Sequence, residues 1–121
     1  MKRTIAAIIF ACGALTAGAA MAGHCGYQNC WGAVGISDNG SFGWSSEYST
    51  ESGAITRVRN QCPGCNRIET FYNTCGAIAT GSSGAWGFGW AGSRGQAEGN
   101  AVTFCANYGY GCQTVVWACS K

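Results

Sequence analysis

The chain has 121 residues, of which 47% are hydrophobic, 12% are aromatic and only 10% are charged. Two of its seven basic side chains, Lys2 and Arg3, stand at the start, and the other five balance the five acidic side chains, so the remainder carries no net charge. Such a chain lacks the basic stripe that binds nucleic acid or an acidic membrane surface, and we expect neither as a partner.

The first 22 residues have the pattern of a secretory signal peptide. The positive start is followed by apolar or small residues over positions 4–21, and Ala20-Met21-Ala22 is a small-x-small cleavage signal. The apolar core is too short and too rich in alanine for a membrane anchor, so we expect no stable membrane insertion after cleavage. The sequence therefore predicts a signal peptide at 1–22 and one small, secreted or periplasmic domain at 23–121.

Of the nine cysteines, eight remain when Cys12 is assigned to the signal peptide. A lipoprotein with an acylated Cys12 is the alternative, but it would place Phe10 where a small residue is normally needed. An even number of cysteines in a small exported chain predicts four disulfides. Covalent links contribute materially here, because a domain of this size buries only about 60–70% of its unfolded surface.

The first part of the domain predicts a β-hairpin followed by a helix and a third strand. Strand-like residues 31–37 and 41–47 flank the turn signal Asp38-Asn39-Gly40. Thr50 is placed to cap a helix, and Pro63-Gly64 ends it. The inward face of this helix carries Ala54, Ile55, Val58 and Cys62, and the strand that Cys65 opens carries Ile68, Thr70 and Tyr72 on one side.

The same order of elements then occurs again, which indicates an internal duplication. Cys75 begins a strand, residues 81–84 form the turn, and a second aromatic strand follows. Ser93 begins a capping box before the second helix. Cys112 opens the last strand, which Cys119 closes.

These patterns predict an α+β domain built from two pseudo-symmetric β-β-α-β repeats, 31–74 and 75–119. The sheets should be mostly antiparallel, the two helices short, and the domain stapled by disulfides. One repeat alone offers only a half-buried ribbon of three strands, so the two should bury their faces together. Packing side by side and exchange of strands are both compatible with the sequence.

The match between the halves also predicts how the cysteines pair. Cys62 and Cys105 stand at matching helix ends, and Cys65 and Cys112 stand at matching strand starts. Cys75 and Cys119 would then join the ends of the two halves, closing the longest loop, which in the chain-entropy model is worth about 4 kcal/mol. The predicted pairs are Cys62–Cys65, Cys105–Cys112, Cys75–Cys119 and Cys25–Cys30.

The second aromatic strand, residues 85–91, alternates large rings with glycine or alanine. A period of two places all the rings on one face and leaves bare backbone on the other, which another element can approach closely. A domain with few leucine and isoleucine residues needs rings for its core, so we expect the aromatic residues of both hairpins to be core. The alternative is that they bind a ligand. The residues concerned are Trp44, Trp86, Phe88 and Trp90.

The ordered set of motifs resembles the small exported bacterial proteins of the domain-of-unknown-function family DUF4189. The residues that carry the resemblance are the Gly-Ala-Val/Ile strands, the aromatic-glycine hairpins, the helix ending in Cys105, and Cys112-x-x-Val-Val with the closing Trp117-Ala118-Cys119. It covers residues 31–121 and implies a secreted or periplasmic, disulfide-bonded α+β domain with no established activity or catalytic residues. Cys25 and Cys30 lie outside the core that the family shares.

The sequence predicts no catalytic residues, cofactor or metal. His24 is the only histidine, and residues 87–92 spell G-x-G-x-x-G without the acidic residue that a dinucleotide site needs about twenty positions on. The carboxylates are scattered singly, so we interpret them as solvated surface groups. A small wall-acting hydrolase would need two of them to meet in space, namely from Glu47, Glu51, Glu69 and Glu98.

Cys62-Pro63-Gly64-Cys65 has the shape of a thiol–disulfide oxidoreductase site, which is the alternative function. A redox-active cysteine usually stands at a helix N-terminus, whereas Cys62 falls at the C-terminus of its predicted helix, so a structural disulfide is favoured. Zinc bound by Cys62, Cys65, Cys105 and Cys112 is disfavoured, because disulfides form after export.

The leading functional hypothesis is a non-enzymatic interaction module that recognises a protein or a cell-wall glycan, for instance as an inhibitor or antagonist. It rests on a neutral, aromatic-rich, stapled domain without a catalytic constellation. Tyr108 and Tyr110 lie in a glycine-flanked loop and are natural contact residues. The candidate contact residues are Tyr108, Tyr110, Trp44, Trp86 and Trp90.

Overall fold

The computed structural model describes residues 24–121, so the predicted signal peptide at 1–22 lies outside the described residues. Two units of the same β-β-α-β layout follow one another. The first consists of β2 (Trp31–Ile36), β3 (Phe42–Tyr48), α2 (Glu51–Gln61) and β4 (Arg67–Tyr72). The second consists of β5 (Thr74–Thr80), the 3-10 turn η1 (Ser82–Gly84), β6 (Trp86–Ala91), α3 (Arg94–Cys105) and β7 (Gln113–Ser120).

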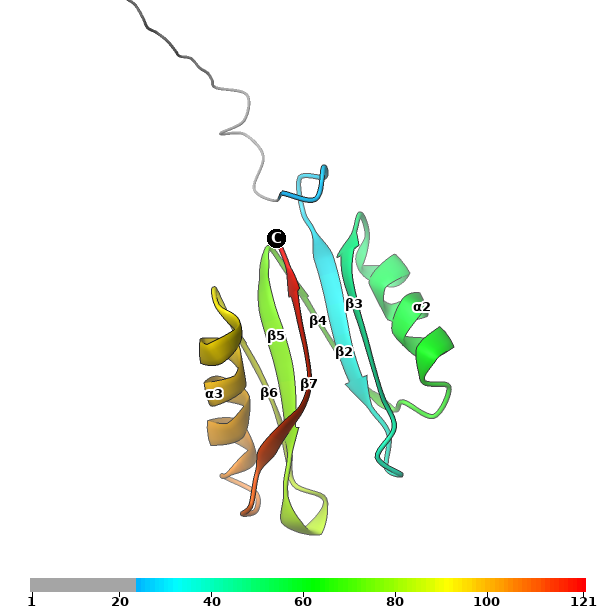
Figure 1. Cartoon of the computed structure of the whole chain (residues 1–121). Coiled ribbons are helices and arrows are strands. Elements are labelled where there is room, and N and C mark those ends of the chain that lie inside the picture. The colour runs from blue at the N-terminus through cyan, green and yellow to red at the C-terminus, as the bar shows by residue number, and fades with distance from the viewer. Residues whose placement is uncertain (1–23) are drawn as a thin grey trace, which may run out of the picture.

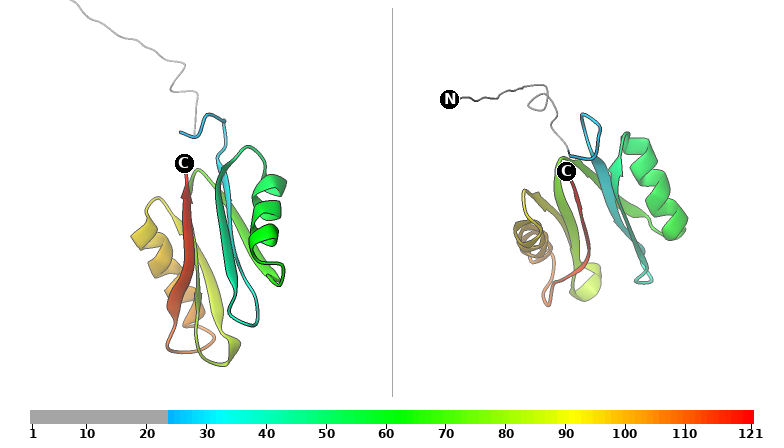
Figure 2. Two further views of the ribbon diagram at one scale, coloured as in Figure 1. Left: turned by 45° about the vertical axis from the view of Figure 1, so that its right-hand side comes forward. Right: turned by 45° about the horizontal axis from the view of Figure 1, so that its top comes forward.

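Each unit forms its own antiparallel sheet with the first strand in the middle, in the orders β3-β2-β4 and β6-β5-β7. The two sheets face each other, and each helix covers the outer face of its own sheet (Figures 1 and 2). The fold is therefore the predicted α+β arrangement. The units pack side by side and exchange no strands.

The core between the sheets is organised around one large ring. Phe71 of β4 is almost completely buried, and it lies over Gly32 of its own sheet and Gly76 of the facing sheet. A Cβ atom would stand 2.7 Å from this ring at Gly32 and 2.5 Å from it at Gly76, so both positions require glycine. The other buried members of this core are Val34, Ile36, Ile78, Val116 and Ala118.

The bare face of β6 is in direct contact with α3. A Cβ atom at Gly87 would lie 2.4 Å from the backbone nitrogen of Cys105, and one at Gly89 would lie 2.3 Å from that of Ala101. The helix backbone therefore rests on the glycines, as the alternation in the sequence predicts. The three rings of β6 consequently point away from α3, toward the side of the facing sheet.

Both helices begin at the predicted caps. The Thr50 hydroxyl accepts a hydrogen bond from the Gly53 N–H at 3.1 Å, and the Ser93 hydroxyl accepts one from the Gln96 N–H at 3.3 Å. The third strand of the first unit begins later than expected, at Arg67, because the Cys65 N–H turns back to the Cys62 carbonyl at 2.9 Å.

Four disulfides are present, and they are the four pairs that the sequence predicts: Cys25–Cys30, Cys62–Cys65, Cys75–Cys119 and Cys105–Cys112. The expectation that Cys75–Cys119 joins the two halves is wrong. These cysteines stand directly opposite each other in β5 and β7, neighbouring strands of the second sheet. No disulfide of the described residues crosses between the units. Packing of the sheet faces and a hydrogen bond from the Glu47 N–H to the Ser120 hydroxyl at 2.8 Å hold the units together.

Candidate binding groove

The aromatic residues of the two hairpins are not the closed core that the sequence led us to expect. Trp44 is 48% exposed and Trp90 is 60% exposed, while Trp86 and Phe88 are half-buried. The rings do point toward the facing sheet, because they stand opposite Val34, Ile78 and other inward positions. However, β3 and β6 are edge strands, so each has a neighbouring strand of its own sheet on one side only.

A hollow of about 630 Å³, here called the β6 groove, follows the free edge of β6. Strand β6 contributes Trp86, Phe88 and Trp90, and the region where α3 ends contributes Phe104 and Tyr108. Phe104 and Tyr108 stack with their ring centroids 6.4 Å apart. Glu69 of β4 is the one carboxylate in the lining. An adjoining hollow shares Phe88 and Trp90 with this groove.

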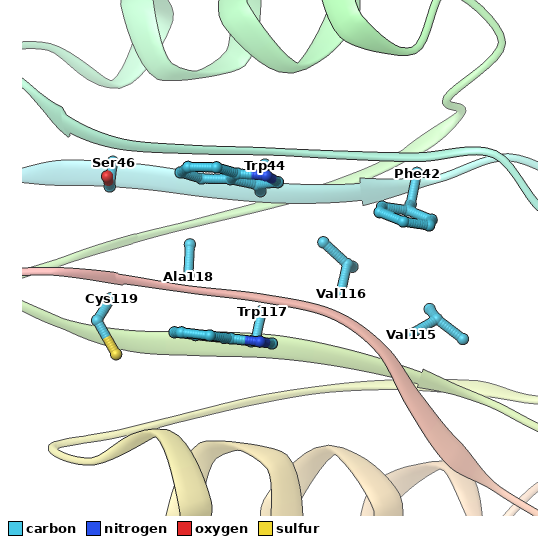
Figure 3. Close-up of a pocket in the computed structure, with 8 residues that line it drawn as sticks. All are labelled: Phe42, Trp44, Ser46, Val115, Val116, Trp117, Ala118 and Cys119. Carbon is cyan, nitrogen blue, oxygen red and sulfur yellow. The ribbon is translucent and has the colours of Figure 1, made fainter.

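A second groove lies between the edge strands β3 and β7 and has a volume of about 430 Å³ (Figure 3). Figure 3 shows Trp44 and Phe42 on one side and the residues of β7 on the other. No charged side chain lines it. Trp117 belongs to this groove, and the Arg94 guanidinium lies 4.0 Å from the centre of its ring. We call it the β3 groove.

The structure brings some of the candidate contact residues together and separates others. Trp86, Trp90 and Tyr108 share the β6 groove, whereas Trp44 lies in the β3 groove. Tyr110 is 81% exposed and lines neither groove, and its backbone is held by hydrogen bonds to Ser82.

Two lining residues were missed by reasoning from the sequence. Phe104 lies near the end of α3 between the buried Ala101 and Cys105, yet it is 52% exposed. Glu69 was counted as a solvated carboxylate. Its position in an alternating strand does carry a signal, because Phe71, two residues later on the same face, is a buried ring.

Glu69 is half-buried, and its burial raises the pKa of the carboxyl above the ordinary value. Within residues 24–121, no ion pair or side-chain hydrogen bond reaches this carboxylate. The neighbouring cation, Arg67, instead donates to Asp38 at 2.7 Å, and this contact lowers the pKa of Asp38. The groove therefore contains an acidic group that the fold itself does not neutralise.

Several residues named for the alternative functions can be placed in the described structure. Glu69 shares the inward face of β4 with Phe71, whereas Glu51 accepts from Thr70 on the opposite face, so these two carboxylates do not meet. Cys62 and Cys65 are joined and buried at the C-terminal end of α2. That is the end at which the helix dipole disfavours a thiolate.

The remaining motifs have structural roles. In residues 87–92 the first two glycines of the G-x-G-x-x-G pattern are covered by α3, which leaves no room for a phosphate. Across residues 24–121 there is no group of three or more histidine, cysteine, aspartate or glutamate side chains placed to hold a metal ion. In the same part of the chain, none of the helices has the length and apolar character to span a membrane.

The fold and grooves define a class: an α+β protein of two facing three-stranded sheets, each with one outer helix, stapled by disulfides. Within that class the chain belongs to the domain-of-unknown-function family DUF4189, whose model matches residues 31–119. It is also similar to the NMR structure of Rv1813c from Mycobacterium tuberculosis, with 28% identity over 74% of each chain and a TM-score of 0.59. A comparison with curated proteins found no match.

Proposed function

We propose that this protein is an exported, non-enzymatic binding module that recognises a protein or cell-wall glycan through the β6 groove. The observation that carries the proposal is the gathering of Trp86, Trp90 and Tyr108, with two further rings, around one open hollow. Exposed aromatic rings supply large contact area at a low entropic cost, and they are enriched at binding hot spots.

The scaffold around the groove supports this role because a close helix contact and a disulfide constrain it. The α3 backbone rests on Gly87 and Gly89, and the Cys105–Cys112 disulfide ties the end of α3 to the start of β7. The Phe104 and Tyr108 rings thus stand on a clamped segment. A site that is ordered before the partner arrives loses less conformational entropy on binding.

Export and duplication are part of the same proposal. The four disulfides are typical of an oxidising compartment, which is consistent with cleavage of a signal peptide at 1–22. The matching layout of the two units, with caps at Thr50 and Ser93, is what duplication of one β-β-α-β unit would produce.

The test compares the wild type with Trp90→Ala and with the matched control Trp44→Ala in the other groove. Each protein is immobilised and exposed to periplasmic extract, culture medium and sedimented cell wall. We expect Trp90→Ala to lose at least tenfold in retention of the same partner, and Trp44→Ala to keep it, because Trp90 lines the β6 groove and Trp44 does not. Equal retention by wild type and Trp90→Ala would show that the groove is not the recognition site.

A further inference from the structure

The free edges of β3 and β6 differ in their hydrogen-bond partners. In the first unit, the Trp44 N–H on the edge of β3 donates to the Gln61 side-chain oxygen at 2.7 Å. This oxygen also lies 3.1 Å from the position of a Cβ atom at Gly43. The end of α2 therefore covers its edge strand with a hydrogen-bond acceptor.

Phe104 takes the place of this glutamine in the second unit. Its Cβ lies 2.9 Å from the position of a Cβ atom at Gly87, where Gln61 instead places its side-chain oxygen near Gly43. Phe88 pairs with Ile78 as Trp44 pairs with Val34. A phenyl ring has no acceptor for the strand, so no side chain of residues 24–121 takes the Phe88 N–H. The backbone edge of β6 at Phe88 therefore lacks a side-chain hydrogen-bond partner in the part of the groove lined by aromatic rings.

The direction of the Phe88 backbone follows from its neighbour on the strand. The Trp90 carbonyl accepts from the Asn100 side chain at 3.2 Å, so it points away from β5. Residues two apart in an antiparallel strand direct their backbone groups to the same side. The N–H and C=O of Phe88 therefore also point outward, into the hollow, where an extended segment can pair with them.

The carboxylate beside this edge stands where the other unit has a buried apolar residue. Glu69 pairs with Val34 in the first sheet, and Val116 pairs with Ile78 in the second. Val116 is almost completely buried, whereas Glu69 has a hollow in front of it. A partly buried negative charge with no partner in the described residues is costly, and a cation of a ligand would offset that cost.

Contacts within the chain indicate which kind of cation fits beside the aromatic rings of the groove. The guanidinium of Arg67 lies 5.5 Å from the centre of the Trp86 ring, and that of Arg94 lies over Trp117. Asp38 pairs with Arg67 at 2.7 Å, which reduces the repulsion that this arginine exerts on a second cation at Glu69. A planar guanidinium can stack on an indole and pair with a carboxylate at once, which an ammonium does less well.

We propose that the β6 groove binds an extended segment of a partner protein that pairs with the edge of β6 at Phe88 and places an arginine side chain against Glu69. The inference rests on the proposed function and names its ligand: a protein strand instead of a glycan.

The experiment titrates the full mature protein with the blocked peptide Ac-Thr-Val-Arg-Val-Thr-NH2 and follows NMR signals of the Trp86 and Trp90 indole N–H groups and the Phe88 amide. A second peptide carries citrulline, which has the shape of arginine without its charge. Glu69→Gln is the test variant, and Glu98→Gln, on the outer helix α3, is the matched loss of one carboxylate. A tetramer of N-acetylglucosamine is the glycan probe.

We expect the arginine peptide to shift all three signals and the citrulline peptide to bind about tenfold more weakly. Glu69→Gln should reduce binding of the arginine peptide about tenfold and leave the citrulline peptide unaffected, while Glu98→Gln should match the wild type. The citrulline comparison uses the wild-type protein, so it decides the matter even when a variant folds poorly.

Three results would overturn the inference. Equal binding of the two peptides would show that the arginine charge does not contribute. An unchanged NMR signal of the Phe88 amide would show that the peptide does not pair with the strand. Shifts of both indole signals by the glycan tetramer, in wild type and Glu69→Gln alike, with no response to either peptide, would leave the proposed function standing and make the ligand a sugar. The proposed function is tested separately: equal retention of the partner by wild type and Trp90→Ala would contradict it, whatever the peptides do.

Discussion

The two units have the same layout, yet they hold their outer strands to the central strand in different ways. In the second unit the Cys75–Cys119 disulfide joins the start of β5 to the end of β7. At the corresponding place in the first unit, Trp31 pairs with Tyr72, and their ring centroids lie 4.8 Å apart. The comparison teaches that one position in the fold accepts either a covalent link or an aromatic contact.

The β6 groove arises from differences of the same kind. The first unit supplies Glu69 where the second has Val116, and the second supplies Phe104 where the first has Gln61. Neither change alone makes a charged hollow beside an open strand edge. The candidate site is therefore located where the two units depart from one another.

The largest expected effect concerns the ring that the two sheets share. Phe71→Ala should lower the free energy of unfolding by about 3–5 kcal/mol, because it leaves a cavity over Gly32 and Gly76. Urea unfolding with the disulfides intact measures the loss. Phe104→Ala, which removes an exposed ring of the same size, should cost far less, and similar losses would contradict the central role of Phe71.

The disulfides of the two units should differ in value according to the loops they close. Replacing Cys75 and Cys119 together by alanine should cost about 4 kcal/mol, since the cysteines are 44 residues apart. Replacing Cys62 and Cys65, which are three residues apart, should cost only about 2 kcal/mol. Thermal and urea unfolding of the two double variants give the comparison, and the reverse order would refute the loop argument.

Substitutions at the two helix ends should change how the edges of β3 and β6 form hydrogen bonds. Gln61→Ala removes the acceptor of the Trp44 N–H and should cost about 1 kcal/mol or less, because water can replace it. Phe104→Gln places an acceptor beside Phe88 and should weaken the arginine and citrulline peptides several-fold and equally. The same NMR titrations detect this. Unchanged affinities would mean that the peptide does not use the strand edge.

The smallest expected effects concern the carboxyl groups of Glu69 and Asp38, whose pKa values are shifted in opposite directions. Burial raises the pKa of Glu69, so the folded state takes up a proton more readily than the unfolded chain. The unfavourable contribution of its charge is then complete at neutral pH and absent below the ordinary value of 4.5. Glu69→Gln should therefore stabilise the protein at pH 7, by less than about 1 kcal/mol because solvent reaches part of the side chain.

This stabilisation should shrink as the pH falls through the raised pKa of Glu69. Asp38→Asn should act in the opposite way. Arg67 lowers the pKa of Asp38, so its contribution is present above 3.8 and is lost as the pH falls through the lowered value. Urea unfolding between pH 3 and pH 7 tests both signs.

Much of the fold could be predicted because the signals that specify it are local. Thr50 and Ser93 mark the helix starts, and the glycines that alternate with rings in residues 86–91 identify a strand with one bare face. The matching positions of cysteines in the two halves led to the pairs Cys62–Cys65 and Cys105–Cys112, and the remaining four cysteines were then assigned. Each of these features depends on residues close together in the sequence or on a comparison of equal segments.

The tertiary structure alone decided where the rings and charges ended up. Alternation places Trp44 and Trp90 on the inward face, but only the strand order makes β3 and β6 edges and leaves these rings exposed. Likewise, Glu69 becomes a groove residue because β4 lies across from β6, and Cys75–Cys119 stays within one sheet because β5 and β7 are neighbours. Periodicity tells which face of a strand a side chain occupies, whereas contacts between distant segments determine what covers that face.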